Sequence, residues 1–175
     1  TLTGGAGADT VDGGAGNDVV RVNGADDNGA ESLDGGADTD TLRALVPTDL
    51  TAATAVKNFE MVALDEAANL QLAAGALATN PGLTQVAGTA GGVIETLTFV
   101  GDDGMDDAID LSQFTKATDA GLVAMGLAGN DTLTGSSLAD TLMGGAGDDI
   151  FVIANAADHA AGEIIDGGLG NDVIR

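Results

Sequence analysis

Apolar residues follow two patterns along the chain. At both ends a nine-residue unit recurs, in which Gly-Gly-x-Gly-x-Asp is followed by three residues with an apolar one in the middle. Its clearest copies are GGAGADTVD and GGAGNDVVR (4–21), GGADTDTLR (35–43), GGAGDDIFV (144–152) and GGLGNDVIR (167–175). Between the two ends, apolar and polar residues alternate in short runs. Each nonapeptide therefore predicts a turn followed by a short strand whose middle side chain points inward.

The alternating runs predict strands with one buried face, because successive side chains of a strand point to opposite sides. These runs lie at 59–64, 69–72, 95–100 and 108–111, with turn residues between them at Asn80-Pro81-Gly82, Gly91-Gly92 and 101–104. The alternative is a helix within 51–78, where alanine is dense and Asp49 would cap the first turn. We expect strands that continue a solenoid with larger, mostly metal-free coils.

The glycine-rich turns carry the candidate chemistry. Glycine at positions one, two and four of the unit permits positive φ angles and a turn too tight for a Cβ. Such a turn directs several carbonyl oxygens to one point, and the Asp at position six adds a carboxylate. A site made only of oxygen atoms, in a chain with no cysteine, favours calcium over zinc or copper.

Adjacent units in register resemble the calcium-binding nonapeptide repeat of the RTX family, G-G-x-G-x-D-x-U-x with U apolar. The resemblance implies an all-β fold: a right-handed parallel β-roll or β-solenoid with several calcium ions between its turns. Because successive turns fall on opposite sides of such a solenoid, each ion is expected between one turn and the next but one. RTX proteins are bacterial, are secreted by a type I pathway with an uncleaved C-terminal signal, and fold in external calcium.

The alternation of sides assigns the position-six acids to pairs. The expected pairs are Asp18 with Asp40, Asp9 with Glu31, Asp131 with Asp149, Asp140 with Glu163, and Asp149 with Asp172; Glu31, Asp140 and Glu163 are secondary candidates. The turn residues expected to contribute to these metal sites are Gly5, Gly7, Gly13, Gly14, Ala15, Gly16, Gly35, Gly36, Gly144, Gly145, Ala146, Gly147, Gly167, Gly168, Leu169 and Gly170.

Some turns depart from the pattern. Asp38 replaces the position-four glycine, which puts the geometry of that turn in question. In GSSLAD, Ser136 and Leu138 replace two glycines, so we expect a metal-free turn there. The acidic loop 101–107 (GDDGMDD) is either one further calcium site or a plain solvated loop.

The repeats divide the chain into three parts. Residues 1–43 form a first repeat block, 44–126 a metal-poor spacer, and 127–175 a second block. The second block repeats the order of the first, including an enlarged turn, at an offset of about 131 residues. We therefore expect an excerpt of a longer tandem protein, in which 127–175 begins the next unit.

Composition narrows the function further. The net charge of −23 opposes compaction unless cations neutralise it, and it disfavours nucleic acid and anionic membranes as partners. No apolar run approaches the ~20 residues of a membrane helix. There is no catalytic motif: His159 is the only histidine and has no nucleophile placed beside it, and the absence of Trp and Tyr disfavours a sugar site.

The expected function is a calcium-binding structural module, without catalytic residues or an organic cofactor, in an extracellular or cell-surface bacterial protein. We expect it to fold on calcium binding and to act as a scaffold. One alternative is an adhesin or surface-layer module that binds a cell, a glycan or a neighbouring copy. Another is the accessory repeat domain of a secreted protease, lipase or epimerase. Copies of the chain are expected to pair end to end through exposed strand ladders.

Overall fold

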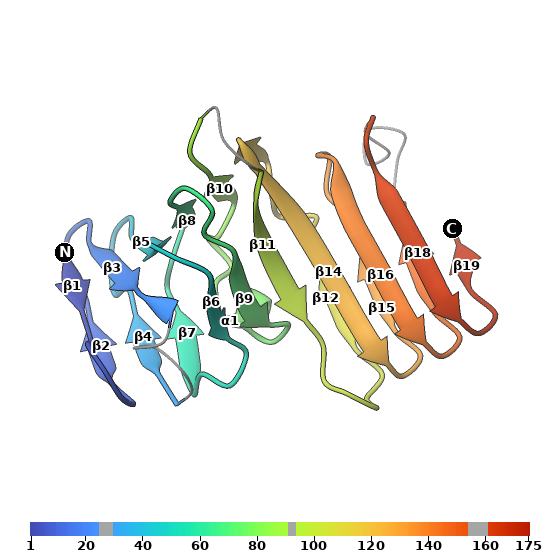
Figure 1. Ribbon diagram of the computed structural model, residues 1–175, viewed down its shortest axis with the longest axis horizontal. Helices are drawn as coiled ribbons and strands as arrows, with labels where there is room; N and C mark the ends of the chain where they lie inside the picture. The colour runs from blue at the N-terminus through green and yellow to red at the C-terminus, as the bar shows by residue number, and fades with distance from the viewer. Residues whose placement is uncertain (25–29, 91–93, 154–160) are drawn as a thin grey trace.

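The computed structural model describes residues 1–24, 30–90, 94–153 and 161–175. Short parallel strands stack along one axis in about seven turns, with the two ends of the chain at opposite ends of the stack (Figure 1). The predicted all-β parallel solenoid is confirmed. His159, the Gly91-Gly92 turn and residues 25–29 of the first enlarged turn lie outside the described residues.

A first sheet of six parallel strands begins at the N-terminal end. Its strands, in spatial order, are β1 (Leu2–Thr3), β3 (Val19–Val22), β5 (Thr41–Ala44), β8 (Met61–Leu64), β10 (Gln85–Ala87) and β13 (Lys116–Thr118). Their register stacks the middle apolar residues directly on one another, as in Val20, Leu42, Val62 and Val86. All four are buried, so each coil adds one rung to an apolar ladder.

A second sheet of six parallel strands reaches the C-terminal end. Its order is β6 (Thr48–Leu50), β9 (Leu70–Ala73), β11 (Glu95–Val100), β14 (Ala120–Ala128), β16 (Asp140–Ala146) and β18 (Ile164–Leu169). The predicted strands at 59–64, 69–72 and 95–100 correspond to β8, β9 and β11. β14 was not predicted, and it crosses the expected boundary between spacer and second block at residue 126.

The third side of the solenoid is interrupted. It consists of β2 (Thr10–Asp12), β4 (Ser32–Asp34) and β7 (Ala55–Lys57), then helix α1 (Ala76–Thr79), then β12 (Ala108–Asp110), β15 (Thr132–Thr134), β17 (Ile150–Val152) and β19 (Val173–Ile174). The helix packs beside β7, and no ladder joins β7 to β12. The coils therefore have two strands at each end and three sides in the middle.

The helical alternative for 51–78 is wrong for most of that range, which holds β7, β8 and β9. Helix is confined to the four residues of α1. Asp49 does not cap it; its carboxylate accepts hydrogen bonds from the backbone N–H and hydroxyl of Thr51 in a turn. The helix ends at Asn80, whose side-chain amide donates to the carbonyls of Ala76 and Val56, both at 2.8 Å.

The number of sides in a coil determines how large the side chains in its core are. Two-strand coils enclose mostly Val and Leu, with Phe151 on β17 as the large exception, whereas the three-sided coils enclose Phe59, Phe99 and Phe114. The rings of Phe99 and Phe114 lie 5.8 Å apart, centroid to centroid. Burial of these rings gives the middle coils the largest hydrophobic contribution to stability.

Candidate metal centre

Position-six carboxylates of the first block lie in rows along the turns. The backbone N–H of Asp18 donates to Asp40 Oδ1 at 2.7 Å, and the N–H of Asp40 donates to Glu60 Oε2 at 2.7 Å. On the opposite row, the N–H of Asp9 donates to Glu31 Oε2 at 2.9 Å. Each turn is thus joined to the same-side turn of the following coil through a carboxylate.

The second block has the same arrangement. Along the row that leads into the third side, the N–H of Asp107 donates to Asp131 Oδ1 and that of Asp131 to Asp149 Oδ1, both at 2.8 Å. The N–H of Asp149 donates to Asp172 Oδ1 at 3.0 Å. On the opposite side, the N–H of Asp140 donates to Glu163 Oε2 at 3.2 Å. The structure therefore brings together all five pairs expected from the sequence.

The second oxygen of many of these carboxylates is buried without a hydrogen bond. In the described part of the chain these atoms include Asp9 Oδ2, Glu31 Oε1, Asp40 Oδ2, Glu95 Oε2, Asp131 Oδ2 and Asp149 Oδ2. Asp40 and Asp149 are fully buried. A buried, unpaired carboxylate oxygen is costly unless a cation compensates it. All of these residues except Glu95 were expected to be metal ligands.

The electrostatic environment of Asp131, in the second block, also favours a bound cation. Burial raises the pKa of the Asp131 carboxyl above its ordinary value, and the hydrogen bond from the N–H of Asp107 opposes that rise. The neighbouring charges of Asp149, Asp107 and Asp106 raise the pKa further. Negative charge is therefore concentrated at this site. The described side-chain ion pairs, Arg43 with Asp65 and Lys57 with Asp34, do not involve these carboxylates.

The glycines of the unit have two separate roles. Positions two and four have positive φ, for example 112° at Gly145 and 146° at Gly147. Position one does not, which corrects the expectation that all three positions need positive φ. A Cβ on Gly144 would instead collide with the carboxylate of Asp149 and lie 2.8 Å from the carbonyl oxygen of Gly167. Position one therefore leaves room for the carboxylate and a carbonyl of the next coil.

The other expected turn residues occupy equivalent places. Positive φ occurs at Gly5, Gly7, Gly14, Gly16, Gly36, Gly168 and Gly170. The position-one glycines Gly13, Gly35 and Gly167 lie against the next coil or their own carboxylate. Ala15 pairs with Ala37 in an isolated parallel bridge, and Ala146 pairs with Leu169 between β16 and β18. Calcium coordination by these residues stays a prediction.

Two imperfect turns keep the geometry of the unit. Asp38 takes the position-four conformation with φ of 84°, and its Oδ2 accepts a hydrogen bond from the N–H of Gly16 at 3.1 Å. Leu127, at position two of GLAGND, has φ of 78°. The turn geometry is therefore imposed by the stacked coils and does not require glycine at every position.

The GSSLAD turn differs in chemistry. Ser136 donates to Asp140 Oδ2 both from its backbone N–H, at 2.6 Å, and from its hydroxyl, at 2.9 Å. These bonds engage the oxygen that has no partner at Asp131 and Asp149. The arrangement supports the expected metal-free turn at this position.

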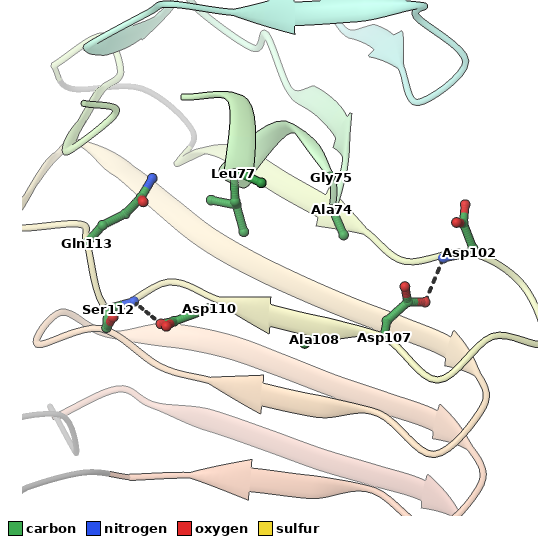
Figure 2. A pocket seen from close by; sticks show the side chains of 10 residues that line it. Ala74, Gly75, Leu77, Asp102, Asp107, Ala108, Asp110, Ser112 and Gln113 are labelled. Carbon is green, nitrogen blue, oxygen red and sulfur yellow. Dashed lines mark hydrogen bonds between the residues drawn. The ribbon is translucent and has the colours of Figure 1, made fainter. Parts of the chain in front are cut away.

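The acidic loop 101–107 keeps the geometry of a repeat, because Asp107 extends the Asp131 row. Its Oδ2 accepts a hydrogen bond from the N–H of Asp102 at 2.7 Å, as Asp140 Oδ2 does from Ser136, so calcium binding by this loop stays a prediction. A Cβ on Gly101 would lie 2.5 Å from Asp107 Oδ2 and 2.7 Å from the carbonyl oxygen of Gly126, as at position one of a repeat. Figure 2 shows Asp102 and Asp107 at one end of a cavity of about 460 Å³ between α1 and β12. Its lining has no nucleophile–base pair, and Ser112 donates its N–H to Asp110.

Sequence reasoning missed a second row of side chains at position five. The backbone N–H groups of Asn130, Asp148 and Asn171 each donate to a position-five side chain of the preceding coil, at 2.7, 2.9 and 2.8 Å; those acceptors are Asp106, Asn130 and Asp148. The recurrence of Asn or Asp at position five was the available signal. Positions five and six thus link neighbouring coils in opposite directions.

The donor set fits a hard divalent cation. No three acidic or histidine side chains converge among residues 1–24, 30–90, 94–153 and 161–175. A cation here would instead be held by carboxylates at position six together with turn carbonyls, all of them oxygen ligands. The unpartnered buried oxygens and the glycine cradles are the observations that support this fit.

A family model for the RTX calcium-binding nonapeptide repeat (four copies) matches residues 1–28, 124–152 and 160–175. The matched segments carry Asp9, Asp18, Asp131, Asp149 and Asp172. No curated protein and no solved structure matches the chain. The helix in the described part of the chain is too short to cross a membrane.

Proposed function

Because the chain carries RTX calcium-binding nonapeptide repeats, we propose that it is a calcium-dependent structural module of a secreted or cell-surface protein. The observation that supports this most directly is the row of buried position-six carboxylates with unpartnered oxygens. The repeat and the solenoid are structural rather than catalytic elements. The proposed blocks are 1–43 and 127–175, separated by the spacer 44–126.

The chain's own residues explain the dependence on cation. Asp18 and Asp40, or Asp149 and Asp172, place carboxylates from same-side turns close together, and the net charge of −23 adds repulsion between coils. Bound calcium would supply the positive charge that makes this stacking favourable. Ladder pairing and the stacked Val, Leu and Ile side chains then hold the coils, so the free energy of binding contributes to folding.

A calcium titration followed by far-UV circular dichroism tests the proposal, with magnesium as the comparison ion. We expect a cooperative gain of β signal at about 0.1–1 mM calcium, the range of extracellular modules, and none with magnesium. The double substitution Asp18→Asn and Asp149→Asn should abolish the cooperativity. The matched control, Glu66→Gln with Asp12→Asn, removes two exposed carboxylates that are not position-six acids and should leave the midpoint unchanged.

Equal responses to the two ions, or equal midpoints for the row and control variants, would refute calcium-dependent folding through these sites. A scaffold role would be consistent with end-to-end pairing of copies. The last coil exposes Ile164, Leu169, Val173 and Ile174, and β18 and β19 are edge strands. Analytical ultracentrifugation in calcium should then detect oligomers that Ile174→Asp weakens.

A further inference from the structure

Glu95 is a buried carboxylate in the spacer that neither the nonapeptide pattern nor the family match covers. It is the first residue of β11 and is 1% exposed. Its Oε1 accepts a hydrogen bond from the N–H of Ala67 at 3.1 Å, whereas its Oε2 is buried with no hydrogen-bond partner. A carboxylate in this position needs a compensating positive charge.

The surroundings of Glu95 repeat the position-six arrangement without the motif. Ala67 donates from the turn of the preceding coil, as Asp9 does to Glu31. A Cβ on Gly88 would lie 2.5 Å from Glu95 Oε2 and would collide with the carbonyl oxygen of Asp119 in the following coil. Gly88 therefore plays the part of a position-one glycine, and two oxygen atoms from different coils lie close to the same point.

No protein cation is available to Glu95 among the described ion pairs. Arg43 pairs with Asp65 at 2.7 Å, and Lys57 pairs with Asp34 at 2.7 Å. None of the described ion pairs involves Glu95, so a cation from solution is the available source of compensating charge. With only carboxylate and carbonyl oxygens present, a hard divalent cation is the ligand that suits the site.

We propose that Glu95 Oε2 and the carbonyl oxygen of Asp119, beside Gly88, hold a calcium ion within the spacer. The proposal rests on the calcium-dependent function above and extends it to a part of the chain expected to be metal-poor. The site joins described residues of three consecutive coils: Ala67 between β8 and β9, Gly88 directly after β10, and Asp119 between β13 and β14. It would secure the widest coils, where the third side is interrupted.

The test compares Glu95→Gln with Asp149→Asn and with the control Glu66→Gln, which lies in the same row of turns but is exposed. Equilibrium dialysis with calcium gives the number of bound ions per chain. We expect Glu95→Gln to lose one ion, Asp149→Asn to lose at least one, and Glu66→Gln to lose none. A Glu95→Gln count equal to wild type overturns the proposal.

Unfolding by urea in chelator provides a second readout. Glutamine keeps the acceptor for Ala67 N–H and removes the unpaired negative charge, so Glu95→Gln should be at least as stable as wild type in chelator. In calcium the order should reverse. A variant less stable than wild type in chelator would show a purely structural role and overturn the proposal. If wild type itself binds no calcium, the proposed function fails as well; if only the Glu95→Gln comparison fails, that function stands.

Discussion

At the scale of single residues, the spacing of the coils determines which glycines are indispensable. Gly14 and Gly36 both occupy position two, with φ of 86° and 103°. A Cβ on Gly14 would meet nothing within 4 Å, whereas one on Gly36 would collide with the backbone of Gly14. Alanine at Gly14 would therefore add backbone strain alone, whereas alanine at Gly36 would add both strain and a steric clash.

We expect Gly14→Ala to lower the free energy of unfolding by about 1–3 kcal/mol, the range for a non-glycine residue at an unfavourable φ. Gly36→Ala should cost more, because the collision adds to the strain. Urea unfolding in saturating calcium measures both. Equal costs would argue against the close approach of Gly36 to the preceding turn.

The nine-residue period was enough to predict the positions of the paired acids, because period and alternation of sides determine which turns face each other. It could not predict that Leu127 and Asp38 adopt glycine-like conformations, since a conformation imposed by neighbouring coils leaves no trace in composition. Glu95 was missed for a related reason. Gly88 and Glu95 are seven residues apart, whereas positions one and six of the unit are five apart, so the place of Glu95 in the carboxylate rows is visible only once the coils are stacked.

At the scale of strands, an ion pair links β4 to β7. Lys57 Nζ lies 2.7 Å from Asp34 Oδ2, and Asn58 Nδ2 donates to Asp34 Oδ1 at 2.7 Å. These two partners lower the pKa of the Asp34 carboxyl below 3.8. Since the folded pKa lies below the unfolded one, ionised Asp34 stabilises the fold above pH 3.8, and this contribution is lost as pH falls through the folded pKa.

Lys57→Gln should therefore raise the pKa of Asp34 towards 3.8 and reduce that acid-sensitive contribution. Carboxyl-carbon NMR titration measures the pKa directly. Lys116→Gln, on another sheet, is the matched control and should leave it unaltered. An Asp34 pKa that is insensitive to Lys57 would contradict the ion pair between these two side chains.

Element prediction succeeded where periodicity was strong and failed where tertiary context decided. The run at 95–100 matches β11 residue for residue, because Thr96, Leu97, Thr98 and Phe99 alternate between polar and apolar. β14 contains three buried residues in alternation, Leu122, Ala124 and Gly126, but two of them are too small to register as an apolar pattern. Helix α1 has no side-chain cap at its start, and Asn80 ends it through contacts with β7 that the local sequence does not reveal.

At the scale of the whole molecule, stability is unevenly distributed. The middle coils bury Phe59, Phe99 and Phe114, whereas the terminal coils bury mainly Val and Leu, with the single ring of Phe151, beside dense rows of carboxylates. In chelator we expect amide hydrogen exchange to be slowest in β9 and β11 and fastest in the edge strands β1 and β19, which contain no buried residue. Calcium should slow exchange most in the terminal coils. Uniform protection in chelator would contradict this gradient.

The interruption of the third side also has a mechanical consequence. Through the middle of the molecule, two sheets are continuous, whereas the third side is interrupted between β7 and β12, where α1 takes the place of a strand. We expect such a solenoid to resist bending in the planes of its two continuous sheets and to bend more easily towards the interrupted third side. Under load, we expect the molecule to bend first at α1, towards the interrupted side.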